Sequence, residues 1–166
     1  MVQNLKKIIP QKDGSLMIES IVATSLVVIG ILGIMSLLAR SAHISHFTTH
    51  SLQATYLAAE GIEVVKNILD TDVAKGLAWG THVTTGSYCV SYDTSALVSC
   101  SGQGDLAYDP ATGFYSATSS SSYFRRIVAI TGSGNSFDVS STVRWYEGGI
   151  EKSVTLEDTF ENWRSP

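Results

Sequence analysis

The pattern of apolar and polar positions changes character near residue 40 and again near residue 75. Residues 20–39 form an uninterrupted run of twenty uncharged residues, most of them apolar. At 1.5 Å per residue, a helix of this length is about 30 Å long, which is the thickness of the hydrocarbon core of a bilayer. The run is longer than the apolar core of a secretory signal peptide. It therefore predicts that residues 15–40 form a transmembrane helix.

Beyond Arg40, apolar and small residues continue at intervals of three and four, which places them on one face of a helix. They are Ile44, Phe47, Ser51, Ala54, Ala58, Ile62, Val65 and Leu69. The pattern predicts an amphipathic continuation of the same helix over residues 41–75, for about 55 residues in all. Gly61 is expected to weaken it by about 1 kcal/mol relative to alanine. Lys75 and Gly76 are typical of a helix end.

From residue 76 onwards, alternating apolar and polar positions predict β-strands. Strands are expected at 123–130, 137–146 and 151–159, with turns at Gly132–Asn135 and Glu147–Gly149. Strands joined in this way form an antiparallel meander with one apolar face, and the amphipathic helix can cover that face. The predicted fold class is α+β, with a long N-terminal, partly transmembrane helix packed against a small C-terminal antiparallel sheet. Residues 76–166 would form a β-rich exported head.

The two cysteines, Cys89 and Cys100, lie in segments that also have strand character. A hairpin of residues 87–92 and 97–100, closed by the loop at 93–96, would place them opposite each other. That arrangement brings the two Cα atoms within disulfide distance. A disulfide would persist in an exported domain, and the alternative is two unpaired, buried cysteines.

The charge distribution limits the kinds of partner and predicts an orientation in the membrane. The formal net charge is −4, with +2 in residues 1–14 and therefore −6 in the remainder. This acidic balance argues against nucleic-acid binding through bulk electrostatics. Three lysines precede the apolar run, which predicts a cytoplasmic N-terminus with the C-terminal head outside.

The start of the apolar run contains a carboxylate, Glu19, whose burial in hydrocarbon costs about 2.5 kcal/mol or more. It is the fifth residue after Gly14, which ends a short basic segment. The segment Gly14-Ser15-Leu16-Met17-Ile18-Glu19 resembles the type III signal of type IV pilins and pseudopilins, where glycine is followed by Phe-Thr-Leu-Ile-Glu. The two agree at Gly14, Ile18 and Glu19, while Ser15 replaces the usual phenylalanine. Residues 58–63, Ala-Ala-Glu-Gly-Ile-Glu, also resemble the helix of minor pilins.

The resemblance implies a structural role. Residues 1–14 would be a leader that a prepilin peptidase removes after Gly14, and Ser15 would become the N-methylated first residue. The freed amine is largely cationic at neutral pH, so it and Glu19 could neutralise each other within or between subunits. The chain would then be a minor pilin or pseudopilin of a type IV pilus or a type II secretion-like filament. Its partners would be other pilin subunits, the peptidase and an inner-membrane assembly platform. It would lie in the inner membrane before assembly into an extracellular filament.

A different class of function remains open. Glu19 could lie near the lipid headgroups of an ordinary anchor, and the head could be an exported, adhesin-like binding domain that does not polymerise. The tyrosines could then form a stacking surface for sugars or single-stranded nucleic acid, although edge-strand and core roles explain them equally well. They are Tyr88, Tyr92, Tyr108, Tyr115 and Tyr123.

The sequence contains no recognisable set of nucleophile, base and orienting residue, so no catalysis and no cofactor are expected. His43, His46 and His50 share one helix face. They could bind a metal ion or could simply form a polar face outside the membrane. No metal site is predicted from them. Asp105 and Asp109 lack the spacing of a calcium-binding loop.

Overall fold

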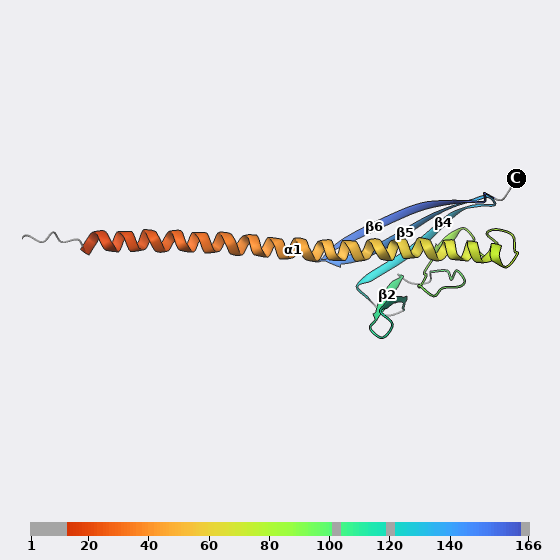
Figure 1. The fold of residues 1–166 in the computed structure, drawn as a ribbon, viewed down its shortest axis with the longest axis horizontal. Helices are drawn as coiled ribbons and strands as arrows, with labels where there is room; N and C mark the ends of the chain where they lie inside the picture. Colours follow the sequence, from red (N-terminus) through yellow and green to blue (C-terminus); the bar gives the residue numbers. More distant parts are fainter. Residues whose placement is uncertain (1–12, 101–103, 119–121, 164–166) are drawn as a thin grey trace, which may run out of the picture. The chain divides into compact units, whose positions relative to one another are not determined.

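The computed structural model describes residues 13–100, 104–118 and 122–163 (Figure 1), so the predicted leader lies outside this range except for its last two residues. The chain divides into two compact units, residues 1–46 and residues 47–166. Helix α1 (Asp13–Ala74) begins in the first unit and ends in the second, and six strands follow it. These are β1 (Gly86–Tyr88), β2 (Asp105–Asp109), β3 (Phe114–Ala117), β4 (Phe124–Ser133), β5 (Ser136–Glu147) and β6 (Ile150–Glu161).

The fold class is α+β, as the sequence predicts. All strand pairs are antiparallel, and the order β3-β2-β4-β5-β6 contains the expected meander of β4, β5 and β6. Glu147 pairs with Ile150, so the intervening turn consists of Gly148 and Gly149. Both glycines have positive φ, 58° and 79°, which suits the hairpin turns that match the twist of a sheet. The turn between β4 and β5 is also confirmed, because Ser133 pairs with Ser136.

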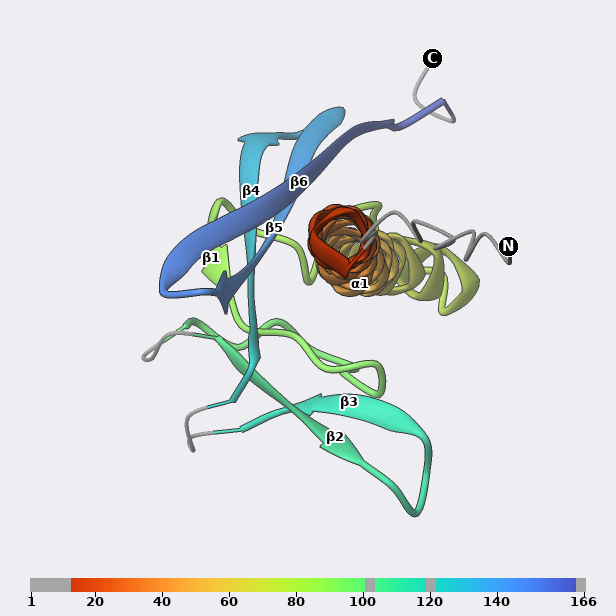
Figure 2. The same ribbon diagram turned by 90° about the vertical axis from the view of Figure 1, so that its left-hand side faces the viewer.

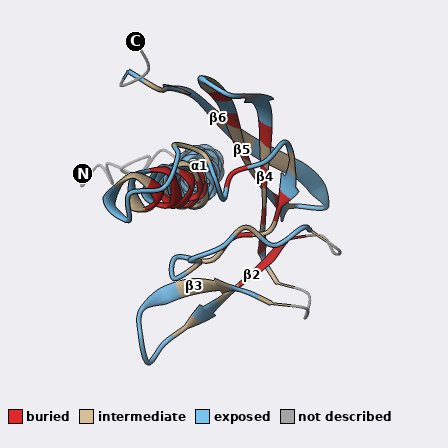
Figure 3. Ribbon diagram, turned by 90° about the vertical axis from the view of Figure 1, so that its right-hand side faces the viewer, coloured by how far each residue is buried: buried red, intermediate tan, exposed pale blue. Residues whose placement is uncertain are grey.

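In the second unit, one face of α1 covers one face of the sheet (Figures 2 and 3). The predicted stripe is partly right, because Ala54, Ala58, Val65 and Leu69 are buried, whereas Phe47 is 40% exposed. The stripe omitted three large apolar helix residues that are also buried, namely Leu57, Val64 and Ile68. The buried face therefore uses both the i+3 and the i+4 neighbours in each turn. This wider stripe is typical of a helix packed on a core.

The end of α1 is confirmed and has a specific geometry. The N–H of Leu77 donates to the carbonyl of Asp72, and the N–H of Gly76 donates to the carbonyl of Val73, at 2.9 and 3.0 Å. Gly76 has φ of 73°. This pair of hydrogen bonds around a left-handed glycine is the Schellman motif, which satisfies the last carbonyls of a helix. Gly76 therefore ends the helix through its backbone conformation.

The predicted cysteine hairpin is right in its antiparallel pairing and in the disulfide between Cys89 and Cys100, but its register is wrong. Tyr88 pairs with Ser99, and the N–H of Cys89 donates to the carbonyl of Val98 at 3.3 Å. The expected register would have placed Cys89 opposite Cys100. The first segment contributes the three-residue strand β1, which also pairs with β4 on its other side.

Strands β2 and β3 were missed by the sequence analysis. They form a short hairpin, and β2 also pairs with β4 through Asp105 and Leu106. The sequence of Asp105–Asp109 gives little indication of a strand, because aspartate is uncommon in strands and only three residues lie between the two aspartates. Its position depends on the neighbouring strand: the N–H of Arg126 donates to the carbonyl of Gly104 at 2.7 Å.

Gly61 is the point at which α1 approaches the sheet most closely among the helix glycines. A Cβ atom added there would lie 2.5 Å from Ser141 Oγ and 3.1 Å from both Arg126 Cδ and Val128 Cγ2. These distances are shorter than normal van der Waals contacts. The sequence-based view of Gly61 as a weak point in the helix is therefore incomplete, because the missing side chain permits the helix–sheet contact.

We expect Gly61→Ala to destabilise the second unit by up to about 2 kcal/mol, since an overpacking cost of about 1–3 kcal/mol outweighs the gain of about 1 kcal/mol in helix propensity. Chemical denaturation of the full chain in detergent micelles would measure this change. The control is Ala59→Gly at an exposed position of the same helix turn, which should lose about 1 kcal/mol through propensity alone. A Gly61→Ala variant that is more stable than the parent would contradict the close packing.

Arg126 is the largest fully buried side chain, and it links α1 to the sheet and to the loop after β1. Its Nη1 donates to the carbonyl of Leu57 at 2.7 Å and to Glu60 Oε1 at 2.9 Å. Its Nη2 donates to the carbonyl of Val90 at 2.7 Å. Burial lowers the pKa of the Arg126 guanidinium, while the charge and hydrogen bond of Glu60 oppose this effect. The guanidinium remains charged, so these acceptors are needed to offset its desolvation.

We expect Arg126→Met to destabilise the second unit by about 3–5 kcal/mol, because it leaves two carbonyls and Glu60 without their donor. The control is Lys66→Met, whose exposed ion pair with Glu63 on α1 should contribute less than about 1 kcal/mol. Denaturant midpoints of the two variants provide the comparison. Equal losses would show that Arg126 contributes no more than a surface ion pair.

Candidate functional site

The candidate functional site is the N-terminal part of α1. Every large apolar side chain between Leu16 and Leu38 is exposed, by 49 to 70% of its surface. The most apolar window of the helix has a mean hydropathy of 2.6, and none of that window is buried. A continuous apolar surface of this size requires lipid or other protein around it. The helix is long and apolar enough to serve as a single-pass membrane anchor.

The polar side chains of this segment are consistent with an apolar environment. Ser20 Oγ donates to the carbonyl of Met17, and Thr24 Oγ1 donates to the carbonyl of Ser20, at 2.9 and 2.7 Å. Ser25 Oγ likewise donates to the carbonyl of Val22 at 2.8 Å. Such bonds to the preceding turn satisfy the hydroxyl hydrogens without water. These three hydroxyl residues are therefore compatible with a position inside a bilayer.

Glu19 differs from these hydroxyl residues. Its side chain is exposed, and within residues 13–100, 104–118 and 122–163 the structure gives it no hydrogen bond or ion pair. A carboxylate cannot form hydrogen bonds with the backbone carbonyls of its own helix, because carboxylate oxygens and carbonyl oxygens are both acceptors. Glu19 is thus the one acidic group of the apolar segment that needs a donor from outside this helix or from a new N-terminus.

Gly14 and Ser15, the residues that would flank the cleavage point, lie in the first turn of α1 as the structure describes it. Ser15 is exposed and lies one helical turn before Glu19. Side chains in a helix tilt toward its N-terminus, so Glu19 extends over the turn that contains Ser15. The backbone nitrogen of Ser15 and the Glu19 carboxylate therefore belong to the same end and side of the helix.

The other residues singled out from sequence are not brought together into one site. No group of three His, Cys, Asp or Glu side chains suited to a metal ion occurs in the described part of the chain. His50 instead contacts Tyr123, with 2.9 Å between its Nδ1 and the tyrosine hydroxyl. Tyr88 is buried, Tyr92 stacks on Phe114, and Tyr108 packs beside Tyr115. Ring contacts also connect Tyr115 and Tyr123 through Phe124, so several of the tyrosines belong to one aromatic cluster from which the buried Tyr88 is separate.

One polar pair near the end of α1 was missed by sequence analysis. The buried Asp72 carboxylate accepts a hydrogen bond from the backbone N–H of His82 at 2.9 Å and contacts Nδ1 of the same residue. Burial raises the pKa of Asp72, but the hydrogen bonds and charge of His82 outweigh this and leave the pKa below its usual range. The ten-residue separation of the two residues gave no motif that could have revealed the pair.

Comparisons of this chain with protein-family models, with curated proteins and with solved structures found no match.

The lowered pKa of Asp72 predicts a pH dependence of stability. A group whose pKa is lower in the folded state contributes stability above its unfolded pKa, which is about 3.9, and that contribution is lost as the pH falls through the folded value. Below about pH 4, the parent chain should therefore lose stability more steeply than Asp72→Asn. Denaturation midpoints measured between pH 7 and pH 2 would check this. Parallel curves for the two proteins would show that the Asp72–His82 contact does not depend on the charge of Asp72.

Proposed function

We propose that this chain is a minor pilin or pseudopilin: a structural subunit that is cleaved after Gly14, anchored by the apolar part of α1, and assembled into a filament. The observation that supports this most directly is Glu19, a carboxylate without a partner among the described residues, at the start of an otherwise uncharged apolar helix segment with exposed side chains. A charge in this position persists only if it gains a partner. The resemblance of residues 14–19 to the pilin signal provides the identity of that partner.

The physical role proposed for Glu19 follows from its position. Cleavage after Gly14 converts the backbone nitrogen of Ser15 into an amine, one helical turn from the carboxylate. The amine of the same subunit or that of a neighbour could then pair with Glu19 inside the packed helices. In a medium of low dielectric constant, a charge pair is strongly favoured over two separated charges. A neighbouring subunit would therefore be held at the axial position where the pair forms.

The proposal includes a location. The lysine-rich leader favours a cytoplasmic N-terminus, so the second unit would lie outside the inner membrane before assembly. A disulfide between Cys89 and Cys100 is consistent with an oxidising compartment. The subunit would be a substrate of prepilin peptidase and of an assembly platform, and it would need no cofactor or catalysis of its own.

The experiment is to express the parent chain, Glu19→Ala and Ser20→Ala in cells that contain the filament machinery. Intact mass and N-terminal sequencing should give a mature chain that begins at Ser15, with or without one methyl group. Glu19→Ala should also be cleaved, but its amount in the sheared filament fraction should fall at least tenfold. Ser20→Ala, which changes the next residue and removes only a local hydrogen bond, should assemble normally.

Two results would overturn the proposal. A chain that still begins at Met1 would mean that Gly14 is not a cleavage site. Normal incorporation of Glu19→Ala into filaments would mean that the carboxylate is not needed for assembly. Either result would favour a simple membrane anchor carrying a binding domain.

A further inference from the structure

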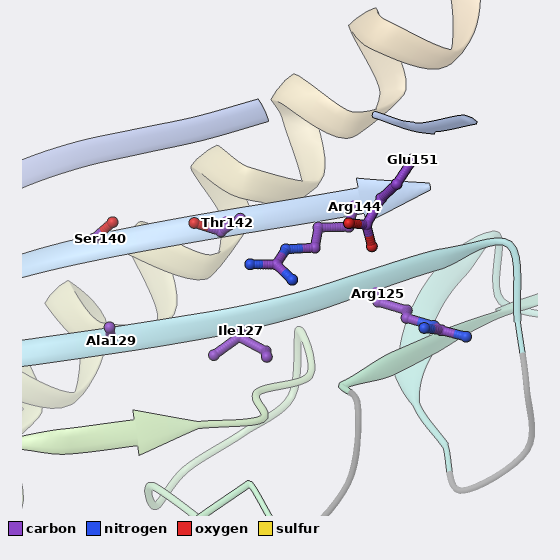
Figure 4. A pocket seen from close by; sticks show the side chains of 7 residues that line it. All are labelled: Arg125, Ile127, Ala129, Ser140, Thr142, Arg144 and Glu151. Carbon is purple, nitrogen blue, oxygen red and sulfur yellow. The ribbon is translucent and has the colours of Figure 1, made fainter. Parts of the chain in front are cut away.

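The sheet has a second face, turned away from α1, and this face contains a hollow between β4 and β5 (Figure 4). Alternate residues of a strand point to opposite faces, so the residues next to the buried positions of β4 and β5 lie here. The hollow has a volume of about 310 Å³, which is within the range of about 300–1,000 Å³ usual for small-molecule sites. We call it the outer-face groove; it is lined by Arg125, Ile127, Ala129, Ser140, Thr142 and Arg144, with Glu151 beside them.

The two arginines of the outer-face groove occupy directly paired positions on β4 and β5. Like charges opposite each other on neighbouring strands repel, and Figure 4 shows the two side chains pointing in different directions. Arg125 Nε donates to Asp105 Oδ1 at 3.2 Å, so its charge is already compensated. Arg144 has no ion pair among the described residues, and its guanidinium extends along the groove on the side of Ile127.

The groove combines four kinds of chemical group in a small space. Arg144 provides an unpaired cation, and the half-buried Ile127 and Ala129 provide an apolar floor. Thr142 Oγ1 lies 2.9 Å from Thr155 Oγ1, so its hydroxyl is held in place and can still accept another hydrogen bond. Glu151 adds an acceptor on the rim. The complementary ligand has one carboxylate, several hydroxyls and a compact apolar face.

Other kinds of partner match the groove less well. A polyphosphate or nucleic acid has several negative charges, whereas the described residues of the groove provide a single uncompensated cation beside the acidic Glu151. A peptide strand cannot be added here, because β4 and β5 are interior strands whose backbone groups are paired on both sides. A second copy of this chain would be repelled overall, since residues 15–166 of each copy carry a net charge of −6.

We propose that the outer-face groove binds a carboxylate-bearing sugar of the hexuronic acid class. Arg144 receives the carboxylate through a charge-assisted hydrogen bond, as guanidinium groups commonly do. Thr142 and Glu151 accept hydrogen bonds from the ring hydroxyls, and Ile127 contacts the carbon face of the ring. This binding does not depend on polymerisation, so it can succeed or fail separately from the filament proposal.

The test uses the full chain in detergent micelles, captured on a surface coated with polygalacturonate. D-glucuronate, D-glucose and acetate serve as competitors at constant ionic strength. We expect glucuronate to displace the chain, whereas glucose, which lacks the carboxylate, and acetate, which lacks the ring, do not do so at the same concentration. Arg144→Gln should weaken binding at least tenfold, and Thr142→Val should weaken it several-fold.

The control variant is Lys66→Gln, which removes the same charge from an exposed position on α1 outside the groove. It should bind as the parent does, and all variants should show the parent's thermal unfolding. Equal losses in Lys66→Gln and Arg144→Gln would mean nonspecific attraction and would overturn the proposal. Displacement by acetate as effective as that by glucuronate would also overturn it, because the groove would then accept any carboxylate, including one from a neighbouring subunit.

Discussion

Helix α1 has to satisfy two different environments with one continuous backbone, and this constraint determines much of the rest of the structure. Between Leu16 and Leu38 all large apolar side chains are exposed, so this part needs apolar surroundings on every side. From Ala54 to Asp72 only one face is buried, and that face covers the sheet. The apolar N-terminal part of α1 makes no use of the sheet, so only the second half of the helix can hold helix and sheet together. The contacts between this second half and the strands therefore have to be strong.

Helix α1 is attached to the sheet by a few close contacts near the middle of its C-terminal half. Gly61 permits the backbone of α1 to approach Ser141 and Val128, and the buried guanidinium of Arg126 reaches back from β4 to the same turn of the helix. Because Arg126 also donates to the carbonyl of Val90, the loop that contains the disulfide is bound to the same point. A buried cation with specific acceptors tolerates little displacement, since each lost acceptor leaves part of its desolvation uncompensated.

The sequence predicted those parts of the fold that depend on local periodicity. The long helix, its end at Gly76 and the meander of β4, β5 and β6 all follow from repeated spacing and from turn glycines. The cysteine segments were predicted in the wrong register, and the additional pairing of β1 with β4 was missed because it joins residues about 40 positions apart. Arg126 and the Asp72–His82 pair could not be found either, since a buried polar group is defined by partners that are distant in sequence.

The functional residues divide in the same way into those that a local sequence pattern predicts and those that depend on residues distant in sequence. Gly14, Ser15 and Glu19 were identified from a local motif, and the structure adds the observation that Glu19 has no partner within the described chain. The outer-face groove has no local sequence motif, because its residues come from three strands. They become neighbours only through the register in which these strands pair. Covering one face of the sheet with α1 leaves the other face uncovered, and long side chains beside Ala129 and Ser140 then enclose a hollow. In the proposed subunit, assembly would use the apolar N-terminal part of α1, so the outer face of the sheet would remain available for a ligand.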